Sequence, residues 1–373
     1  MRVLFCGGGT VGHLSPALAV ADAISAKEMD SAVAFIGRDG GDENKVIERF
    51  GYKLYTIKVS GIERRLTLRN LKNITLALKS KNEAKKIIRD FKPDVVFGTG
   101  GYVCWPVIKA AIAENIPTLI HESNAKPGLA TRLLSSKCDR VLLSLPGCEK
   151  ELRRGANIRI VGNPVRDAFF KTDRKTARKR LRIKEDEFLI ASIGGSGGSE
   201  KLNEAVITLM KNYSAKEKGV RHIHASGKKY FKAIKSREPD LCRGRDGCGI
   251  YEFINDMPTL LKAADVVISR CGAMTLAELS AVGAPSILIP SPNVTGDHQH
   301  KNARLIEESG GCILIPEYEL SERTLLDAVR TLKGDEEKRK RLAEAIRKFS
   351  KRDSASLIIG EISSCIDAIS ANK

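Results

Sequence analysis

The sequence lacks the features of secreted, membrane-spanning and zinc-binding proteins. Its nine cysteines are scattered, and no two of them form a Cys-x-x-Cys pair. Zinc sites favour tightly spaced pairs, and disulfide frameworks belong to short secreted chains, so we expect free thiols in a reducing cytoplasm. No apolar run approaches the roughly 18 residues that a membrane-spanning helix needs. The short apolar run before the first glycines is too brief for a signal peptide, so we expect a chain that is neither secreted nor membrane-spanning.

Aromatic side chains are also few, at 5% of the residues, while positive charge is abundant. The net charge of +18 calls for an anionic partner. We do not expect that partner to be nucleic acid, because the sequence shows neither a recognition-helix pattern nor a series of aromatic residues for base stacking.

The charge is concentrated in residues 61–92, which hold ten Lys or Arg against three acidic residues, a balance of 10 − 3 = +7. Leucine and isoleucine side chains recur in the same segment, which therefore reads as basic and amphipathic. Such a segment can lie on an anionic membrane surface. The alternative is a solvated helix with one face in the core.

The 373 residues predict two domains. Short β-branched runs alternate with longer helical stretches, which indicates βαβ units and parallel sheets. We expect two α/β halves of similar size, hinged near residues 163–167. The predicted strands are 3–6, 32–36, 53–57, 95–97, 118–121, 140–143 and 158–161 in the first half, and 188–193, 222–225, 249–252, 266–269, 286–289 and 312–315 in the second.

Four glycine-rich turns each follow a predicted strand and precede a predicted helix, at residues 7–13, 98–102, 194–198 and 270–275. Glycine lets the backbone approach a phosphate closely, and the following helix N-terminus presents unpaired N–H groups to the anion. One such loop can be a tight βα turn and nothing more. Four of them at the carboxyl ends of strands predict a site for phosphate groups.

The first turn formally satisfies the dinucleotide fingerprint, with Gly7, Gly9 and Gly12 in place and an acidic residue, Asp39, after the second strand. His13 at the start of the following helix is unusual for that class, and we predict that it is a catalytic base. A helix N-terminus favours the neutral imidazole, and an unperturbed pKa near 6.5 suits a general base at neutral pH.

In the second half, Glu278 lies in the helix after the fourth turn, where it can reach a ribose diol or stand exposed on the helix surface. The polar loop at 290–303 is rich in groups that can hydrogen-bond sugar hydroxyls. His298 and His300 lie in it, but no third ligand is in view, so we predict no metal site.

The ordered motifs resemble the MurG family, peptidoglycan N-acetylglucosaminyltransferases that act on undecaprenyl-pyrophosphoryl-N-acetylmuramoyl-pentapeptide. The resemblance spans nearly the whole chain; Val11 stands where the family usually has a small residue. The matching motifs are Gly8-Gly9-Thr10-x-Gly12-His13-x-x-Pro16, Gly100-Gly101-Tyr102-Val103, His121-Glu122-x-Asn124, Val161-Gly162-Asn163-Pro164-Val165-Arg166, Gly194-Gly195-Ser196, Glu252-Phe253-Ile254-x-Asp256-Met257, Arg270-x-Gly272-Ala273-x-Thr275-x-x-Glu278 and His298-Gln299-x-x-Asn302-Ala303.

The resemblance implies an α/β fold of two Rossmann-like domains facing across a cleft (the GT-B glycosyltransferase fold), with no cofactor and no metal. Residues 1–165 would form the acceptor- and membrane-facing domain, together with a C-terminal helix at about 353–373 that packs back on it. Residues 166–352 would bind UDP-N-acetylglucosamine.

It also implies site residues. The catalytic residue would be His13, and the residues facing the acceptor would be Gly9, Gly100, Gly101 and Tyr102. The donor-binding residues would be Thr10, Val11, Gly12, Asn124, Arg166, Ser196, Ile254, Ala273, Met274, Thr275, Leu276, Ala277, Glu278 and Gln299.

The implied reaction is an inverting transfer of N-acetylglucosamine to the 4-hydroxyl of the acceptor's N-acetylmuramoyl residue. The implied partners are UDP-N-acetylglucosamine, the undecaprenyl-linked muramoyl-peptide acceptor, an anionic membrane surface at the cytoplasmic face of the plasma membrane, and other cell-wall synthesis or division proteins. Three alternatives stay open: another glycolipid transferase or a UDP-N-acetylglucosamine epimerase of related fold, a dehydrogenase that uses residues 7–12, and a non-catalytic cell-wall scaffold.

Overall fold

The structure is a computed structural model that describes residues 1–8, 11–27, 30–41, 44–60, 68–145, 147–195, 197–244, 247–294 and 297–370. Among the residues it describes, no helix has both the length and the apolar character needed to cross a membrane. The chain divides into two compact units. The N-terminal unit comprises Met1–Val165 and Lys351–Lys373, and the C-terminal unit comprises Arg166–Ser350.

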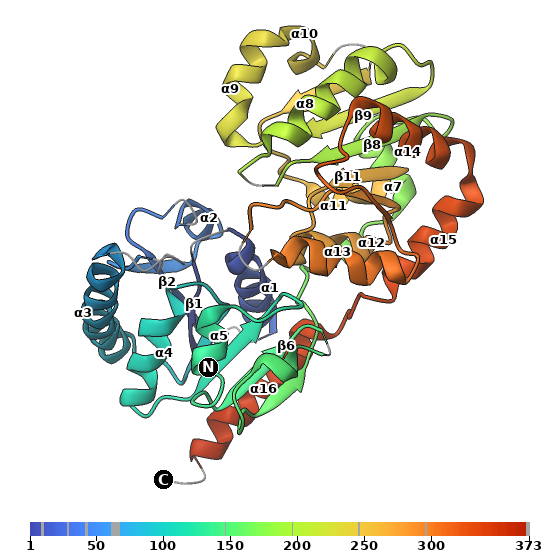
Figure 1. Ribbon diagram of the computed structural model, residues 1–373. Helices are drawn as coiled ribbons and strands as arrows, with labels where there is room; N and C mark the ends of the chain where they lie inside the picture. Colours follow the sequence, from blue (N-terminus) through green and yellow to red (C-terminus); the bar gives the residue numbers. More distant parts are fainter. Residues whose placement is uncertain are drawn as a thin grey trace. The chain divides into compact units, whose positions relative to one another are not determined.

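The N-terminal unit is built on a seven-stranded parallel sheet of order β3-β2-β1-β4-β5-β6-β7 (Figure 1). The strands are β1 (Arg2–Cys6), β2 (Ala32–Arg38), β3 (Lys53–Ile57), β4 (Val95–Gly98), β5 (Thr118–Glu122), β6 (Arg140–Leu143) and β7 (Ile158–Ile160). The helices are α1 (Val11–Lys27), α2 (Asn44–Arg49), α3 (Leu68–Phe91), α4 (Cys104–Ala113), α5 (Leu129–Leu134), the 3₁₀ turn η1 (Cys148–Glu151) and α16 (Ser354–Ser370).

Both faces of this sheet are covered, as an all-parallel sheet requires. One face buries Ile88 of α3 and Ile108 of α4 against β1 and β4. On the other face, Ile358 and Ile362 of α16 join the core that α1 forms with Phe5. The end of the chain therefore completes the first unit, and Glu361 forms ion pairs with β6 and β7 through Arg140 and Arg159.

The C-terminal unit repeats the plan with a six-stranded parallel sheet of order β10-β9-β8-β11-β12-β13. The strands are β8 (Phe188–Ile193), β9 (Val220–Ala225), β10 (Cys248–Tyr251), β11 (Val266–Ser269), β12 (Ser286–Leu288) and β13 (Ile313–Leu314). The helices are α6 (Ala168–Lys171), α7 (Arg174–Arg180), α8 (Glu200–Leu209) with the π-turn η2 (Met210–Ser214), α9 (Lys228–Arg237), α10 (Pro239–Cys242), α11 (Met257–Ala263), α12 (Ala273–Val282), α13 (His298–Glu308), α14 (Glu322–Gly334) and α15 (Glu336–Arg347).

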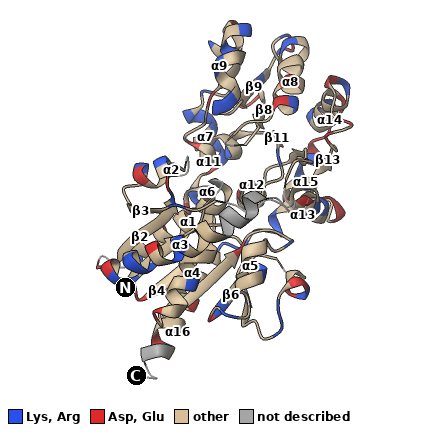
Figure 2. Ribbon diagram, turned by 60° about the vertical axis from the view of Figure 1, so that its left-hand side comes forward, with Lys and Arg blue, Asp and Glu red and all other residues tan. Residues whose placement is uncertain are grey.

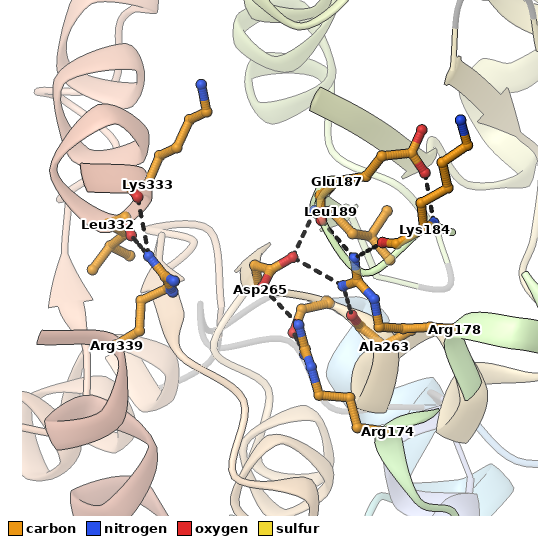
Figure 3. Close-up of polar contacts among 11 residues, drawn as sticks. Arg174, Arg178, Lys184, Glu187, Leu189, Ala263, Asp265, Leu332, Lys333 and Arg339 are labelled. Carbon is orange, nitrogen blue, oxygen red and sulfur yellow. Dashed lines mark hydrogen bonds and ion pairs between the residues drawn. The ribbon is translucent and has the colours of Figure 1, made fainter. Parts of the chain in front are cut away.

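A buried arginine ties the outer helix α7 to this sheet (Figure 3). Asp265, just before β11, accepts hydrogen bonds from Arg174, from Arg178 at 3.1 Å and from the Leu189 amide at 2.7 Å. Arg178 also donates to backbone carbonyls, among them that of Ala263 at 3.1 Å. The guanidinium and the carboxylate thus compensate each other's burial.

The predicted fold class is confirmed. Each predicted strand is present, with its ends shifted by two residues or fewer. Both sheets have the doubly wound order. Successive strands are added to one side of β1 and then, from β4 on, to its other side, and the same switch occurs between β8 and β11 in the second sheet. Ligands of such sheets bind at the carboxyl ends of the strands beside that switch, and the glycine-rich turns lie at these ends.

Candidate functional site

His13 lies in the first turn of α1, beside the loop that follows β4. Its side chain is partly buried. Its Nδ1 is 3.2 Å from the carbonyl oxygen of Thr99, and the Thr99 hydroxyl donates to the His13 carbonyl at 2.5 Å. A carbonyl oxygen only accepts hydrogen bonds, so Nδ1 carries the proton and the neutral ring keeps a lone pair on Nε2. This is the tautomer that a general base needs.

The two glycine-rich turns of the N-terminal unit pack directly on each other. Gly101 has φ +79°, and a Cβ placed there would overlap the carbonyl oxygen of Gly8. A Cβ at Gly100 would lie 3.0 Å from Nδ1 of His13, and a Cβ at Gly7 would overlap the Thr99 hydroxyl. The glycines are therefore required for the loops to meet and to hold the imidazole.

Asn124 follows β5 and is held by a buried carboxylate. Glu122 Oε1 accepts from the Asn124 backbone amide at 3.1 Å and from its side chain at 3.0 Å. Glu122 Oε2 accepts from the Gly128 amide and the Thr131 hydroxyl, both at 2.8 Å. Glu122 thus fixes the loop on which the predicted site residue lies, a role that the sequence analysis did not assign.

For the other predicted site residues of this unit, the structure shows little about contact with a ligand. Tyr102 is partly buried and packs against the hydrophobic core, so part of its side chain is structural. Gly12 is exposed in α1. Gly9 and Thr10 lie outside the described residues, as does the side chain of Val11.

In the C-terminal unit, the helix that follows β11 begins with backbone amides that have no acceptor within the helix. Gly272 is the N-cap of α12, and the Leu276 amide donates to the Gly272 carbonyl at 3.0 Å, which begins the intrahelical ladder. The three preceding amides, those of Ala273, Met274 and Thr275, have no acceptor within the helix and suit an anion.

The predicted donor-binding residues at the start of α12 differ in the groups that they could present to a ligand. Met274 and Leu276 are 8% and 6% exposed, so their side chains pack in the interior. Because the amide of Leu276 is also used within the helix, that residue contributes packing rather than a group for a ligand. Thr275 and Ala277 are partly exposed.

Glu278 lies one turn farther along α12 and is only partly exposed. The surrounding protein removes enough water to raise the pKa of its carboxyl to about 7, while the charge of Arg166 acts in the opposite direction. The two residues are 112 positions apart in the sequence, but the fold brings them close enough for their charges to interact. A carboxyl with a pKa near neutrality is common in functional sites.

Gln299, at the start of α13, joins two of the loops at the carboxyl edge of the sheet. Its Oε1 accepts from the Cys271 amide at 3.2 Å and from the Ser291 amide at 2.9 Å. The Nε2 group of the same amide can only donate hydrogen bonds. Ile254 follows β10, which is four strand spacings, about 19 Å, from β12. A ligand that contacts both ends of this edge is therefore long.

The sequence analysis missed a buried ion pair beneath these loops. Arg270, 7% exposed, pairs with Glu317 and donates to the hydroxyl of Ser199 and to the carbonyl of Ile289 at 3.1 Å. It thereby ties together the loops after β8, β11, β12 and β13. Arg270 stood in a recognised motif, but nothing in the sequence marks Glu317 as its partner. Ser196, a predicted donor contact in the first of these loops, lies outside the described residues.

In the part of the chain that the structure describes, no three His, Cys, Asp or Glu side chains come together as metal ligands would. Eight of the nine cysteines are buried and all nine are free thiols.

Family models match both units. The glycosyltransferase family 28 N-terminal domain matches residues 3–143, and the family 28 C-terminal domain matches residues 189–358. The chain belongs to glycosyltransferase family 28. It is therefore a glycosyltransferase, and the dehydrogenase alternative is set aside.

Curated relatives within family 28 narrow the similarity. A UDP-N-acetylglucosamine–N-acetylmuramyl-(pentapeptide) pyrophosphoryl-undecaprenol N-acetylglucosamine transferase from Acetivibrio thermocellus is 39% identical, over 92% of both chains. The protein of the same name from Caldanaerobacter subterraneus subsp. tengcongensis is 38% identical, over 95% of this chain and 97% of that one. The predicted resemblance to the MurG family is confirmed.

Solved structures support the family 28 fold. MurG of Acinetobacter baumannii has a TM-score of 0.73 at 24% identity, covering 97% of this chain and 99% of that one. A UDP-N-acetylglucosamine 2-epimerase from Neisseria meningitidis has a TM-score of 0.68 at 15% identity, covering 98% and 100%. At these identities the likeness establishes the fold alone.

Proposed function

We propose that this chain transfers N-acetylglucosamine from UDP-N-acetylglucosamine to the 4-hydroxyl of the muramoyl sugar of undecaprenyl-pyrophosphoryl-N-acetylmuramoyl-pentapeptide. The observation that carries the proposal is the near-full-length similarity to relatives that bear this name, at 35–40% identity. The geometry of each unit supplies a role for its residues.

The C-terminal unit binds the donor. The unpaired amides of Ala273, Met274 and Thr275 face its diphosphate, and the growing negative charge on the leaving UDP is stabilised by these fixed dipoles. Glu278 accepts hydrogen bonds from the ribose hydroxyls. Ile254, at the far end of the same sheet edge, contacts the uracil, in keeping with the length of a nucleotide sugar.

The N-terminal unit binds the acceptor and carries the base. Nε2 of His13 takes the proton from the attacking 4-hydroxyl as the new glycosidic bond forms and the bond to UDP breaks. Attack from the face opposite UDP inverts the anomeric configuration. The loops that contain Gly8 and Gly101 lie at the acceptor's pyrophosphate.

The test is incubation with UDP-N-acetylglucosamine and a lipid-linked muramoyl acceptor, followed by mass analysis of the lipid product. We expect the acceptor to gain one N-acetylhexosamine, with release of one UDP. Epimerisation of the donor without acceptor, or no reaction with a folded protein, would contradict the proposal.

We further propose that the enzyme works at the cytoplasmic face of the plasma membrane, with α3 as the contact. Figure 2 shows Lys and Arg along this helix. Its Ala84 and Ile88 are buried in the unit, while Lys79 and Lys86 face outward beside Leu78, which is 53% exposed. The buried face is that of a helix with one side in the core, and the outward face is the one that we assign to the membrane surface. The part at residues 61–67 lies outside the described residues.

Reversal of two charges, Lys79→Glu with Lys86→Glu, should lower activity on vesicle-embedded acceptor and spare activity on a short-chain, water-soluble one. The matched control is Lys232→Glu with Lys235→Glu, two exposed lysines of α9 that change the net charge equally. High salt should release the native enzyme from anionic vesicles, because exposed charges are screened within about 10 Å at 0.1 M. An equal loss of both activities would place α3 in the acceptor site or the fold instead.

A further inference from the structure

A continuous chain of buried polar side chains crosses the C-terminal unit. It joins Ser214, His222, Ser192, His224 and Asn203, each no more than 2% exposed. The successive contacts are Ser214 Oγ to His222 Nδ1 at 2.9 Å, His222 Nε2 to Ser192 Oγ at 2.9 Å, Ser192 Oγ to His224 Nδ1 at 2.8 Å, His224 Nε2 to Asn203 Oδ1 at 3.1 Å, and Asn203 Nδ2 to the Ser226 carbonyl at 2.9 Å.

The last contact fixes the orientation of the Asn203 amide. The Ser226 carbonyl only accepts, so Asn203 points its NH₂ group there and its Oδ1 toward His224, which donates from Nε2. Beyond His224 no single direction is fixed, because Nδ1 of His224 lies 2.8 Å from the Ser192 hydroxyl and also 3.2 Å from the Ser192 carbonyl oxygen.

Both imidazoles are kept neutral by burial. Burial lowers the pKa of His224 to about 4, and burial with the neighbouring His224 lowers that of His222 well below its ordinary value. In such a buried network each hydrogen bond polarises the next.

The chain ends against the glycine-rich turn that follows β8. Gly198 has φ +77°, and a Cβ there would overlap the Ser226 carbonyl oxygen, the atom that Asn203 holds. Gly227, with φ +83°, packs equally closely on the Gly198 amide, and Gly194 donates to the carbonyl of Ala225 at 3.1 Å. The position of residues 225–227 therefore limits the positions of Gly194 and Gly198.

We propose that this chain positions Gly194 and Gly198, at the two ends of the turn after β8, for the donor's diphosphate, and that His224 and Asn203 are positioning residues for donor binding. The proposal rests on the proposed function, in which the C-terminal unit binds the donor. Neither side chain needs to touch the ligand. Each acts through the Ser226 carbonyl, and an error of about 1 Å in the loop is enough to cost up to roughly 100-fold in reactivity.

The test compares His224→Ala, His224→Gln and Val206→Ala in the full-length enzyme. The Gln side chain can place an N–H near the position of Nε2 and so restore the donor to Asn203. Val206 lies on the same helix as Asn203 and is fully buried in the apolar core, so its truncation is the matched control for lost stability. For each variant, UDP affinity is measured by calorimetry, the two substrate KM values by kinetics, and the midpoint by thermal unfolding.

We expect His224→Ala to raise the UDP Kd and the donor KM about 10- to 100-fold, with an unchanged acceptor KM, and His224→Gln to recover most of that loss. Val206→Ala should lower the unfolding midpoint without changing the donor KM. Equal donor KM values for all variants, or a donor KM that follows the midpoint in Val206→Ala too, would overturn the proposal. Failure of the native enzyme to bind UDP would instead refute the donor site itself.

A spectroscopic measurement tests the contact between His224 and Asn203 independently. Nitrogen-15 shifts of the His224 imidazole should show a proton on Nε2 at neutral pH. An unprotonated Nε2 would remove the hydrogen bond to Asn203 Oδ1 and would overturn the proposal.

Discussion

At the scale of single residues, His13 and Glu278 are prepared for their roles by different surroundings. The Thr99 carbonyl holds the proton of His13 on Nδ1, which leaves the other nitrogen basic. Burial removes water from the Glu278 carboxyl and raises its pKa to about 7. A hydrogen bond thus sets the tautomer of His13, whereas burial sets the pKa of Glu278, so the two residues should respond differently to substitution.

Substitution of His13 separates base catalysis from support of the loop. His13→Ala should lower turnover by about 10²- to 10⁴-fold, with nearly normal donor affinity. His13→Asn keeps an N–H that can reach the Thr99 carbonyl but has no basic nitrogen, so it should be as inactive as the Ala variant. Steady-state kinetics and calorimetry measure the two effects. A nearly fully active Asn variant would show that the residue is structural.

Substitution of Glu278 tests the ribose contact. Glu278→Ala should weaken donor binding by about 1–3 kcal/mol, the cost of leaving hydrogen-bonded groups unpaired. Because the carboxyl pKa is raised to about 7, affinity for UDP-N-acetylglucosamine should increase as the pH rises through that value. Glu278→Gln should abolish this pH dependence. Unchanged affinity in a folded Ala variant would remove the residue from the donor site.

At the scale of elements, the glycine turns show that close packing, like the approach of a ligand, requires a residue without a side chain. Gly101 has φ +79°, and Gly101→Ala adds a Cβ that overlaps the Gly8 carbonyl oxygen. It should lower the free energy of unfolding by about 3 kcal/mol or more. Gly40 also has a positive φ, +65°, with nothing within 4 Å of a Cβ, so Gly40→Ala should cost only about 1–2 kcal/mol. Denaturant titration measures the free energy of unfolding of both variants. Equal losses would mean that backbone strain at positive φ, and not the overlap with Gly8, accounts for the effect at Gly101.

Strand β9 should make the protein sensitive to acid. His222 and His224 are buried with lowered pKa values, so between about pH 6.5 and pH 4 the unfolded chain binds protons that the folded chain does not. Stability is therefore full above pH 6.5 and falls as the pH is lowered, by about 1.4 kcal/mol per pH unit for each histidine. Urea titrations of His224→Gln should show a shallower slope than those of the native protein. A native slope in His224→Gln would contradict this origin.

At the scale of the whole molecule, the end of the chain belongs to the unit that its beginning forms. Ile362 of α16 is fully buried against α1, while Leu357 of the same helix is 40% exposed. Ile362→Ala should lower the free energy of unfolding of the N-terminal unit by about 2–5 kcal/mol, and Leu357→Ala by much less. Hydrogen exchange should quicken in β1 and β4 but not in β8 and β11. Faster exchange in both units would mean that they unfold together.

The sequence predicted the strands and their parallel arrangement, because both depend on local pattern. For the same reason it predicted that His13, Glu278 and the glycine turns lie in the loops and helices that follow strands. Hydrophobic runs between helical stretches dictate a doubly wound sheet, and such a sheet sends its loops to one edge. The partners of those residues could not be predicted. Nothing adjacent in the sequence joins His13 to Thr99, 86 positions away, or Arg270 to Glu317.

The sequence by itself thus determined the class of fold and the family, and it named the residues that we propose carry the chemistry. The tertiary structure alone decided their chemical state: which nitrogen of His13 is basic, why Glu278 titrates near neutrality, and how Ser214 and Ser226 come to be joined through two buried histidines. The reason is physical. A strand or a turn follows from neighbouring residues, whereas a tautomer or a pKa follows from groups that only folding brings within hydrogen-bonding distance and screens from water.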